Sequence, residues 1–122
     1  TYDLDGRITR WNKGAEKIFG WKEKETLGQM THLLFTPEDI ASKQPEKELE
    51  ITLKNGRAED ERWHIRKDGS RFFASGVMQP LKDGETEGFV KIARDQTERI
   101  KTETALHEKE MLQKLVKAQE EE

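Results

Sequence analysis

The chain of 122 residues has no cysteine, only 3 prolines and few aromatic residues, which make up 7% of the total. The absence of cysteine excludes disulfide scaffolds, thiolate metal sites, cysteine nucleophiles and photochemistry through a cysteinyl–flavin bond. No apolar run approaches the roughly 20 residues of a membrane-spanning helix, and the first residues lack the features of a signal peptide. We therefore expect a cytoplasmic segment without membrane contact.

Acidic and basic residues are nearly balanced, at 25 and 22, which gives a net charge of −3. Acidic and basic residues are interspersed along most of the chain. Because nucleic-acid binding needs a concentrated cationic surface, we expect no nucleic-acid partner. Because 39% of the residues are charged and only 32% are hydrophobic, one modest core is expected, with part of the chain outside it.

Turn and capping signals divide the first 56 residues into a hairpin and a series of helices. Asp5-Gly6 predicts a tight turn between two short strands, because glycine tolerates positive φ. In the last of the helices, Leu49 and Leu53 define the expected apolar side. Cap residues and stop residues predict helices over 13–19, 22–27, the turn after Thr36-Pro37, and 45–55.

The second half predicts three strands and one long helix. Strands over 58–67, 71–81 and 88–94, joined by turns at 67–70 and 82–85, form an antiparallel meander. Residues 97–122 contain no Gly or Pro and are rich in good helix formers. In this helix Met111 and Leu115 fit a heptad seam. Two interpretations stay open, a solvated single helix and the first heptads of a parallel coiled coil.

This element order, and several short motifs, resemble the PAS domain family. The motifs are residues 5–12 with 14–21, residues 25–29, the turn Arg66-Lys67-Asp68-Gly69-Ser70, and the exit sequence Asp95-Gln96-Thr97-Glu98-Arg99. The resemblance implies an α+β fold with a five-stranded antiparallel sheet, short helices on one face and a long C-terminal exit helix. The domain would cover 1–96, with an incomplete first strand whose sheet edge is exposed or covered by a neighbouring chain. Residues 97–122 would form the exit helix.

The resemblance implies a sensory module of a larger bacterial signalling protein, such as a sensor histidine kinase, with no activity of its own. No phosphate-binding loop, nucleophile elbow or zinc-protease motif is present, so we predict no catalytic or metal site. PAS domains enclose heme, flavins, small carboxylates or no ligand. Heme is disfavoured here because the predicted long helix has no histidine. The cofactor stays unknown, and a small polar or anionic metabolite suits the chain.

Two arguments disagree on which face of strand 58–67 lines the cavity. Burial of apolar residues turns Trp63 and Ile65 inward. The resemblance instead turns Arg62 and His64 inward, and it also places Lys91 there, where an unpaired ammonium group would be costly. The candidate ligand residues under the second argument are Arg62, His64, Ala74, Gly76, Met78 and Phe89.

We expect Arg62 and His64 to present donors to a ligand in the space left by Ala74 and Gly76. The alternative is that Arg62 and His64 pair with carboxylates of the chain and that side chains fill the cavity.

Asp95, Thr97 and Glu98 stand where the last strand meets the exit helix. Such residues cap a helix, and the resemblance makes this junction the route by which a signal leaves the domain. We expect a homodimer, covalently linked to an effector domain. Candidate contact residues are Leu4, Trp63, Ile65, Met111 and Leu115. Two hypotheses follow, a small-molecule sensor and a ligand-free dimerisation or protein-interaction module, with an enzyme a distant third.

Overall fold

The computed structural model describes residues 1–83 and 86–120, so part of the turn predicted at 82–85 and the end of the predicted long helix lie outside the described residues. Five short helices come first, followed by three strands and a long helix. In chain order these are α1 (Lys13–Phe19), α2 (Glu23–Thr26), the 3-10 helix η1 (Thr31–Leu34), α3 (Pro37–Ala41), α4 (Gln44–Asn55), β1 (Ala58–Ile65), β2 (Arg71–Asp83), β3 (Thr86–Asp95) and α5 (Thr97–Glu120).

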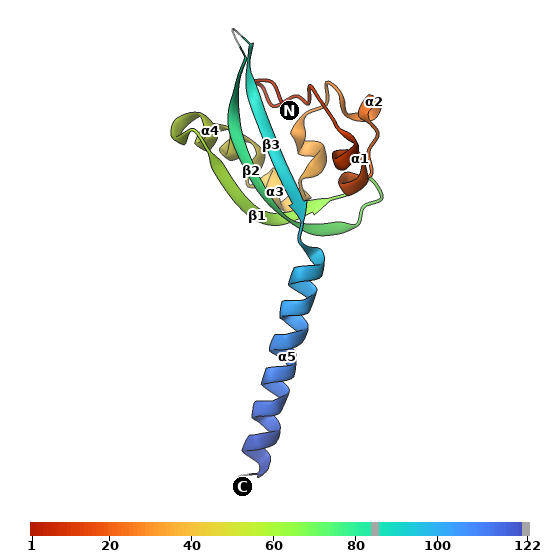
Figure 1. The fold of residues 1–122 in the computed structure, drawn as a ribbon, viewed down its shortest axis with the longest axis vertical. Helices are drawn as coiled ribbons and strands as arrows, with labels where there is room; N and C mark the ends of the chain where they lie inside the picture. Colours follow the sequence, from red (N-terminus) through yellow and green to blue (C-terminus); the bar gives the residue numbers. More distant parts are fainter. Residues whose placement is uncertain (84–85, 121–122) are drawn as a thin grey trace.

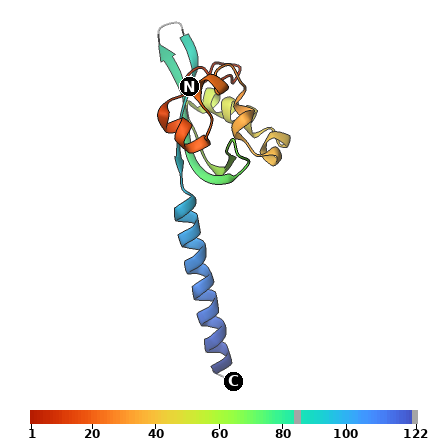
Figure 2. The same cartoon turned by 90° about the vertical axis from the view of Figure 1, so that its right-hand side faces the viewer.

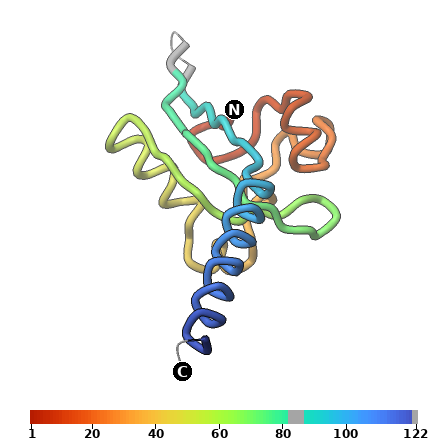
Figure 3. The backbone as a smooth tube through the Cα atoms, turned by 60° about the horizontal axis from the view of Figure 1, so that its bottom comes forward, coloured from red at the N-terminus to blue at the C-terminus, as the bar shows by residue number. Residues whose placement is uncertain are grey.

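The three strands form one antiparallel sheet in the order β1-β2-β3. The sheet is strongly curved, and the short helices lie on one of its faces (Figures 1 and 2). Helix α5 leaves from the end of β3 and extends away from the rest of the chain (Figure 3). The predicted meander and exit helix are confirmed by this arrangement.

Helices α1 to α4 begin and end within one residue of the predicted bounds where these were given, whereas η1 was not predicted. The Asn12 side chain accepts from the backbone N–H of Ala15, and Gly20 ends α1 in the left-handed conformation. Thr36 accepts from the backbone N–H of Asp39 at the start of α3. Such side-chain caps satisfy N–H groups that have no partner within the helix.

The predicted five-stranded sheet is reduced to three strands among the described residues. The turn at Gly6 forms, with φ of 88°, but the flanking residues make only single bridges, such as Tyr2 with Ile8 and Tyr2 with Phe89. The reason lies in the hydrogen bonds. Ile8 donates its N–H to the carbonyl of Gln29 and so bonds to the loop after α2 rather than to a strand.

Helix α4 buries a different side from the predicted one. Leu49 packs against the core, but Leu53 is 61% exposed and Glu48 and Thr52 are buried. A buried carboxylate without a cation beside it is strongly destabilising. The partner of Glu48 is described with the candidate site.

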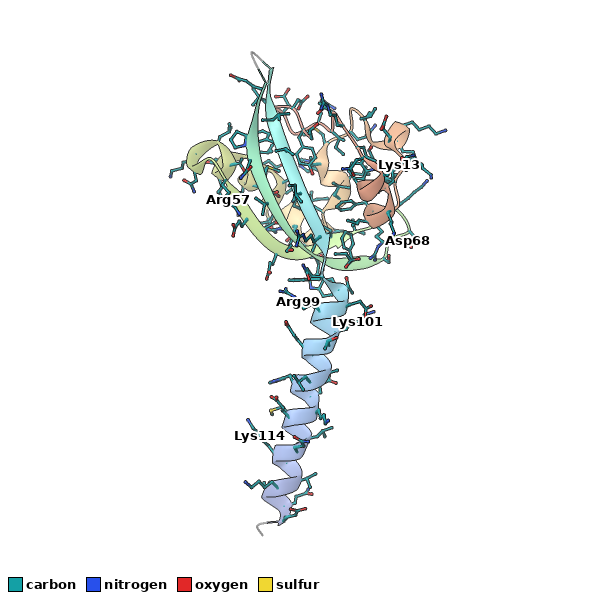
Figure 4. The ribbon with its side chains drawn as sticks, viewed as in Figure 1. Lys13, Arg57, Asp68, Arg99, Lys101 and Lys114 are labelled. Atoms are coloured by element: carbon teal, nitrogen blue, oxygen red, sulfur yellow. The ribbon has the colours of Figure 1, made fainter. Side chains whose placement is uncertain are left out.

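The core lies between the sheet and the short helices, whereas α5 contributes no buried residue. Side chains of α5 such as Lys101 and Lys114 point outward along its length (Figure 4). Among the described helices none has an apolar stretch sufficient to cross a bilayer. The buried hydrophobic residues are Tyr2, Ile8, Trp11, Phe19, Leu34, Phe35, Ala58, Phe72, Ala74, Met78 and Phe89.

Candidate functional site

The structure decides which face of β1 points toward the helices. His64 is only 2% exposed, and Arg62 shares its face of the strand, whereas Trp63 on the other face is 43% exposed. Ile65, also on the outer face, is half-buried. The placement inferred from the family resemblance is therefore right. The one inferred from apolar burial is wrong, because Trp63 finds its contact on the outer face, edge-to-face with Phe73.

A buried ion cluster, formed by Glu48, Asp60, Arg62 and Lys91, joins α4, β1 and β3. The Lys91 Nζ lies 2.7 Å from Glu48 Oε1 and 3.6 Å from Asp60 Oδ2. Arg62 Nε donates to Asp60 Oδ2 at 2.7 Å. Lys91 is thus buried and paired. Burial lowers the pKa of Lys91, but the nearby Glu48, Tyr2 and Asp60 outweigh this, so that its pKa is raised.

The ion cluster occupies the space in which the sequence placed a ligand. The guanidinium of Arg62 also contacts Asp39 Oδ2 at 3.2 Å, so its donors face carboxylates of the chain. A Cβ on Gly76 would lie 2.7 Å from Asp60 Oδ1, which shows that the Asp60 side chain fills the room beside the glycine. The alternative in which Arg62 pairs with carboxylates describes this part of the interior.

Gly76→Ala is accordingly expected to lower the free energy of unfolding by about 1–3 kcal/mol, because the new methyl group displaces Asp60 and meets the Lys91 side chain, 3.0 Å from Cε. Urea unfolding measures the change. Gln79→Ala, at an exposed position on the opposite face of the same strand, is the control and should change stability by less than about 0.5 kcal/mol. Equal effects at the two positions would contradict the packing described.

A separate cavity of about 220 Å³, here called the inner cavity, lies between α1, the N-terminal residues Thr1 and Tyr2, and residues 91–93 of β3. Of the six predicted ligand residues, His64 alone lies on its wall. Ala74, Met78 and Phe89 are core residues instead. The described lining residues are Thr1, Tyr2, Arg10, Trp11, Asn12, Gly14, Ala15, Ile18, Phe19, Leu34, His64, Lys91, Ile92 and Ala93.

His64 is a buried polar residue that lines the inner cavity. Its Nδ1 lies 2.8 Å from the carbonyl oxygen of Leu34, and its ring packs edge-on against Phe19 and Phe35. Burial, reinforced by the positive charge of Lys91, lowers the pKa of His64 to about 4. The ring is therefore neutral at neutral pH.

The junction between β3 and α5 is held by Asp95 and Thr97. Asp95 Oδ1 accepts from the backbone N–H of Thr97 at 2.9 Å and from its hydroxyl at 2.6 Å. The Thr97 hydroxyl oxygen in turn accepts from the backbone N–H of Phe73 on β2 at 3.1 Å. Glu98 is exposed in the first turn of α5. The start of α5 is thus fastened to two strands of the sheet.

Arg66, which the sequence reasoning did not select, connects this junction to α1. Its Nη2 donates to Asp95 Oδ2 at 2.9 Å and its Nε donates to the carbonyl oxygen of Ile18 at 3.1 Å. The guanidinium also lies 4.5 Å from the ring centre of Phe72. Since Ile18 lines the inner cavity, one side chain joins the cavity wall to the N-terminal cap of α5.

The predicted contact residues lie in three separate places. Met111 and Leu115 are 47% and 60% exposed on α5. Leu4 is 46% exposed near the N-terminus, while Trp63 and Ile65 belong to the outer face of the sheet. An open groove of about 680 Å³ runs over that outer face and includes Val77, Val90 and Ile92.

The chain is similar to a known protein family, to a known protein and to solved structures. The sequence profile described as "PAS domain" matches residues 1–98. The chain is 40% identical over 105 residues to "Two-component system protein A" of Emericella nidulans, a match that covers 85% of this chain and 15% of that protein. The chain therefore spans less than a sixth of that relative's length.

Two solved structures show the same fold. The PAS domain of a protein from Colwellia psychrerythraea superimposes with a TM-score of 0.72 and 26% identity, over 80% of this chain and 83% of that one. The PAS domain of a LuxR-family transcriptional regulator from Burkholderia thailandensis, in complex with ethanol, gives a TM-score of 0.64 and 18% identity, over 78% and 85%. By its profile match, its relative and its fold, the chain belongs to the PAS domain family.

Proposed function

We propose that the chain is a cytoplasmic sensory domain that binds a small molecule in the inner cavity and relays its state through α5. The observation that carries the proposal is Arg66, which bonds to Ile18 on the cavity wall and to Asp95 at the cap of α5. A ligand that displaces α1 would pull on Arg66 and so change how firmly the start of α5 is held.

The effector is proposed to lie elsewhere in the same polypeptide and to be a histidine kinase. The relative from Emericella nidulans is by its name a two-component system protein, and this chain corresponds to a small part of it. A sensory domain with an exit helix suits that setting, because a helix transmits rotation or tilt over its whole length.

We further propose that α5 pairs with a second copy in a parallel coiled coil. Its apolar side chains are exposed, and Met111 and Leu115 follow the four-residue spacing of a heptad seam. Rotation of one helix has meaning for an effector only relative to a partner helix. Trp63, Ile65 and Leu4 are proposed as further contacts, which would cover apolar surface on the outer face.

Arg66→Ala is expected to loosen the start of α5 without unfolding the domain. Loss of the Arg66–Asp95 contact weakens the cap, and loss of a helix cap costs about 1 kcal/mol. Amide hydrogen exchange in the first turn of α5 should therefore accelerate about fivefold, while exchange in α4 stays unchanged. Asp95→Ala should act in the same direction, because it removes the capping oxygen itself.

Arg71→Ala is the matched control for Arg66→Ala. Arg71 is a more exposed arginine on the neighbouring strand and pairs with Glu38 rather than with the junction. Exchange in α5 that responds equally to both substitutions would show that Arg66 has no special connection to the helix.

A second candidate function is a ligand-free dimerisation module, which the exposed apolar residues of α5 and of the outer face favour. Native mass spectrometry of freshly purified protein at several concentrations separates the two. A small added mass that is lost on denaturation, and is absent from the cavity-filling variant Ala15→Phe, supports the sensor. A bare dimer supports the second candidate, and a bare monomer at all concentrations contradicts it.

A further inference from the structure

The chemistry of the inner cavity defines the class of ligand that it accepts, provided that the proposed sensory role holds. Apolar side chains, among them Trp11, Ile18 and Phe19, form much of the wall. The volume of about 220 Å³ is smaller than the roughly 300–1,000 Å³ of pockets for drug-sized ligands. A small molecule with an apolar body suits this space.

His64 supplies a single unused acceptor to the cavity. A carbonyl oxygen can only accept, so the contact with Leu34 places the proton of the neutral ring on Nδ1 and leaves Nε2 as a bare lone pair. Among the described residues, the enclosed side-chain polar atoms without a partner are Trp21 Nε1 and His32 Nδ1. His64 Nε2 is not among these enclosed atoms, and the hydrogen bond of the ring is made by Nδ1. Because His64 lines the inner cavity, we assign the Nε2 lone pair to that space.

The cations near the cavity offer little to an anion. Lys91 lies on the wall, but its ammonium group is already held by Glu48 and Asp60. A carboxylate ligand beside Lys91 would also meet the repulsion of these two buried carboxylates. Arg10 lies on the wall as well, but it is exposed to solvent, where an ion pair contributes little.

We propose that the inner cavity binds a small uncharged molecule whose hydroxyl or N–H group donates a hydrogen bond to His64 Nε2, while its apolar body packs against Trp11, Ile18 and Phe19. Small carboxylates should bind this site more weakly than such a molecule. A bound molecule would contact α1 directly and would act on Leu34 through the hydrogen bond from His64.

Three probes of similar size test the proposal: phenol, toluene and benzoate. Phenol carries the donor, toluene replaces it by a methyl group, and benzoate is an anion. Titration calorimetry should show phenol binding at least about fivefold more tightly than toluene, the worth of one hydrogen bond, with benzoate weaker than both. In His64→Phe the preference for phenol over toluene should disappear.

A spectroscopic measurement on the unsubstituted protein keeps the test independent of whether His64→Phe folds. The ¹⁵N resonance of His64 Nε2 should move toward the value of a hydrogen-bonded nitrogen when phenol is added, and should respond much less to toluene. Ala15→Phe, which fills the cavity, should abolish the response, and Lys17→Phe on the exposed side of α1 should preserve it.

The outcomes separate this inference from the proposed function. Tighter binding of benzoate or toluene than of phenol, still blocked by Ala15→Phe, would overturn the inference and leave a ligand-binding cavity. Absence of binding by all three probes at millimolar concentration would overturn both.

Discussion

Lys91→Met lowers the free energy of unfolding by about 3–5 kcal/mol, the cost of removing one partner from a buried ion pair. The substitution leaves Glu48 buried without the ammonium group 2.7 Å away and takes one cation from Asp60. Lys101→Met, on the exposed surface of α5, is the matched control and should change stability by less than about 0.5 kcal/mol. Urea unfolding followed by tryptophan fluorescence measures both.

The double variant Glu48→Met/Lys91→Met distinguishes a lost ion pair from lost packing. A buried pair replaced by apolar residues of similar volume is often neutral in stability, so the double variant should recover most of the loss, while Asp60 keeps its contact with Arg62. This variant also serves as the folded comparison where Lys91→Met alone is too unstable to purify. A double variant less stable than Lys91→Met would contradict the pairing described.

Acidification from pH 6.5 to 4 should destabilise the domain by about 3 kcal/mol through His64 alone. The folded-state pKa of His64 is lowered from 6.5 to about 4, so in this window the unfolded chain takes up a proton that the folded chain refuses. The stability from the neutral ring is complete above pH 6.5 and is lost as the pH falls through the window. Unfolding curves in urea at half-unit pH intervals measure this dependence.

The contribution of His64 is isolated by difference. Burial raises the pKa of Glu48, which acts in the opposite direction at acid pH, but Glu48 is common to both proteins compared. The difference in unfolding free energy between the unsubstituted protein and His64→Phe should therefore shrink by about 3 kcal/mol between pH 6.5 and 4. Gln113→Phe, at an exposed position of α5 without a titrating side chain, should show a constant difference. A constant difference for His64→Phe would show that the ring is not held neutral.

Much of the local structure could be predicted from the sequence, because it depends on neighbouring residues. Asn12 caps α1 by bonding three residues ahead, and Gly20 and Gly56 end helices through their own backbone conformation. These interactions need no knowledge of the rest of the chain. The meander and α5 followed in the same way from strand patterns and from a segment without Gly or Pro.

The interior polar residues could not be assigned by pattern, because their partners lie far away in sequence. The amphipathic pattern predicted that Leu53 lies on the core-facing side of α4. Glu48 is buried on that helix instead, because Lys91 on β3 pairs with it. On β1, apolarity favoured Trp63 inside, and only the resemblance to a known family turned His64 inward. Arg66 was passed over for the same reason, since its importance arises from two contacts that only the fold creates.

If the inner cavity and α5 are connected, a ligand in the cavity should change amide hydrogen exchange in the first turn of α5. Phenol should be added until the His64 Nε2 resonance stops moving. Exchange in this turn should then change in the unsubstituted protein and stay constant in Arg66→Ala. Exchange that phenol leaves unchanged in the unsubstituted protein would contradict the connection.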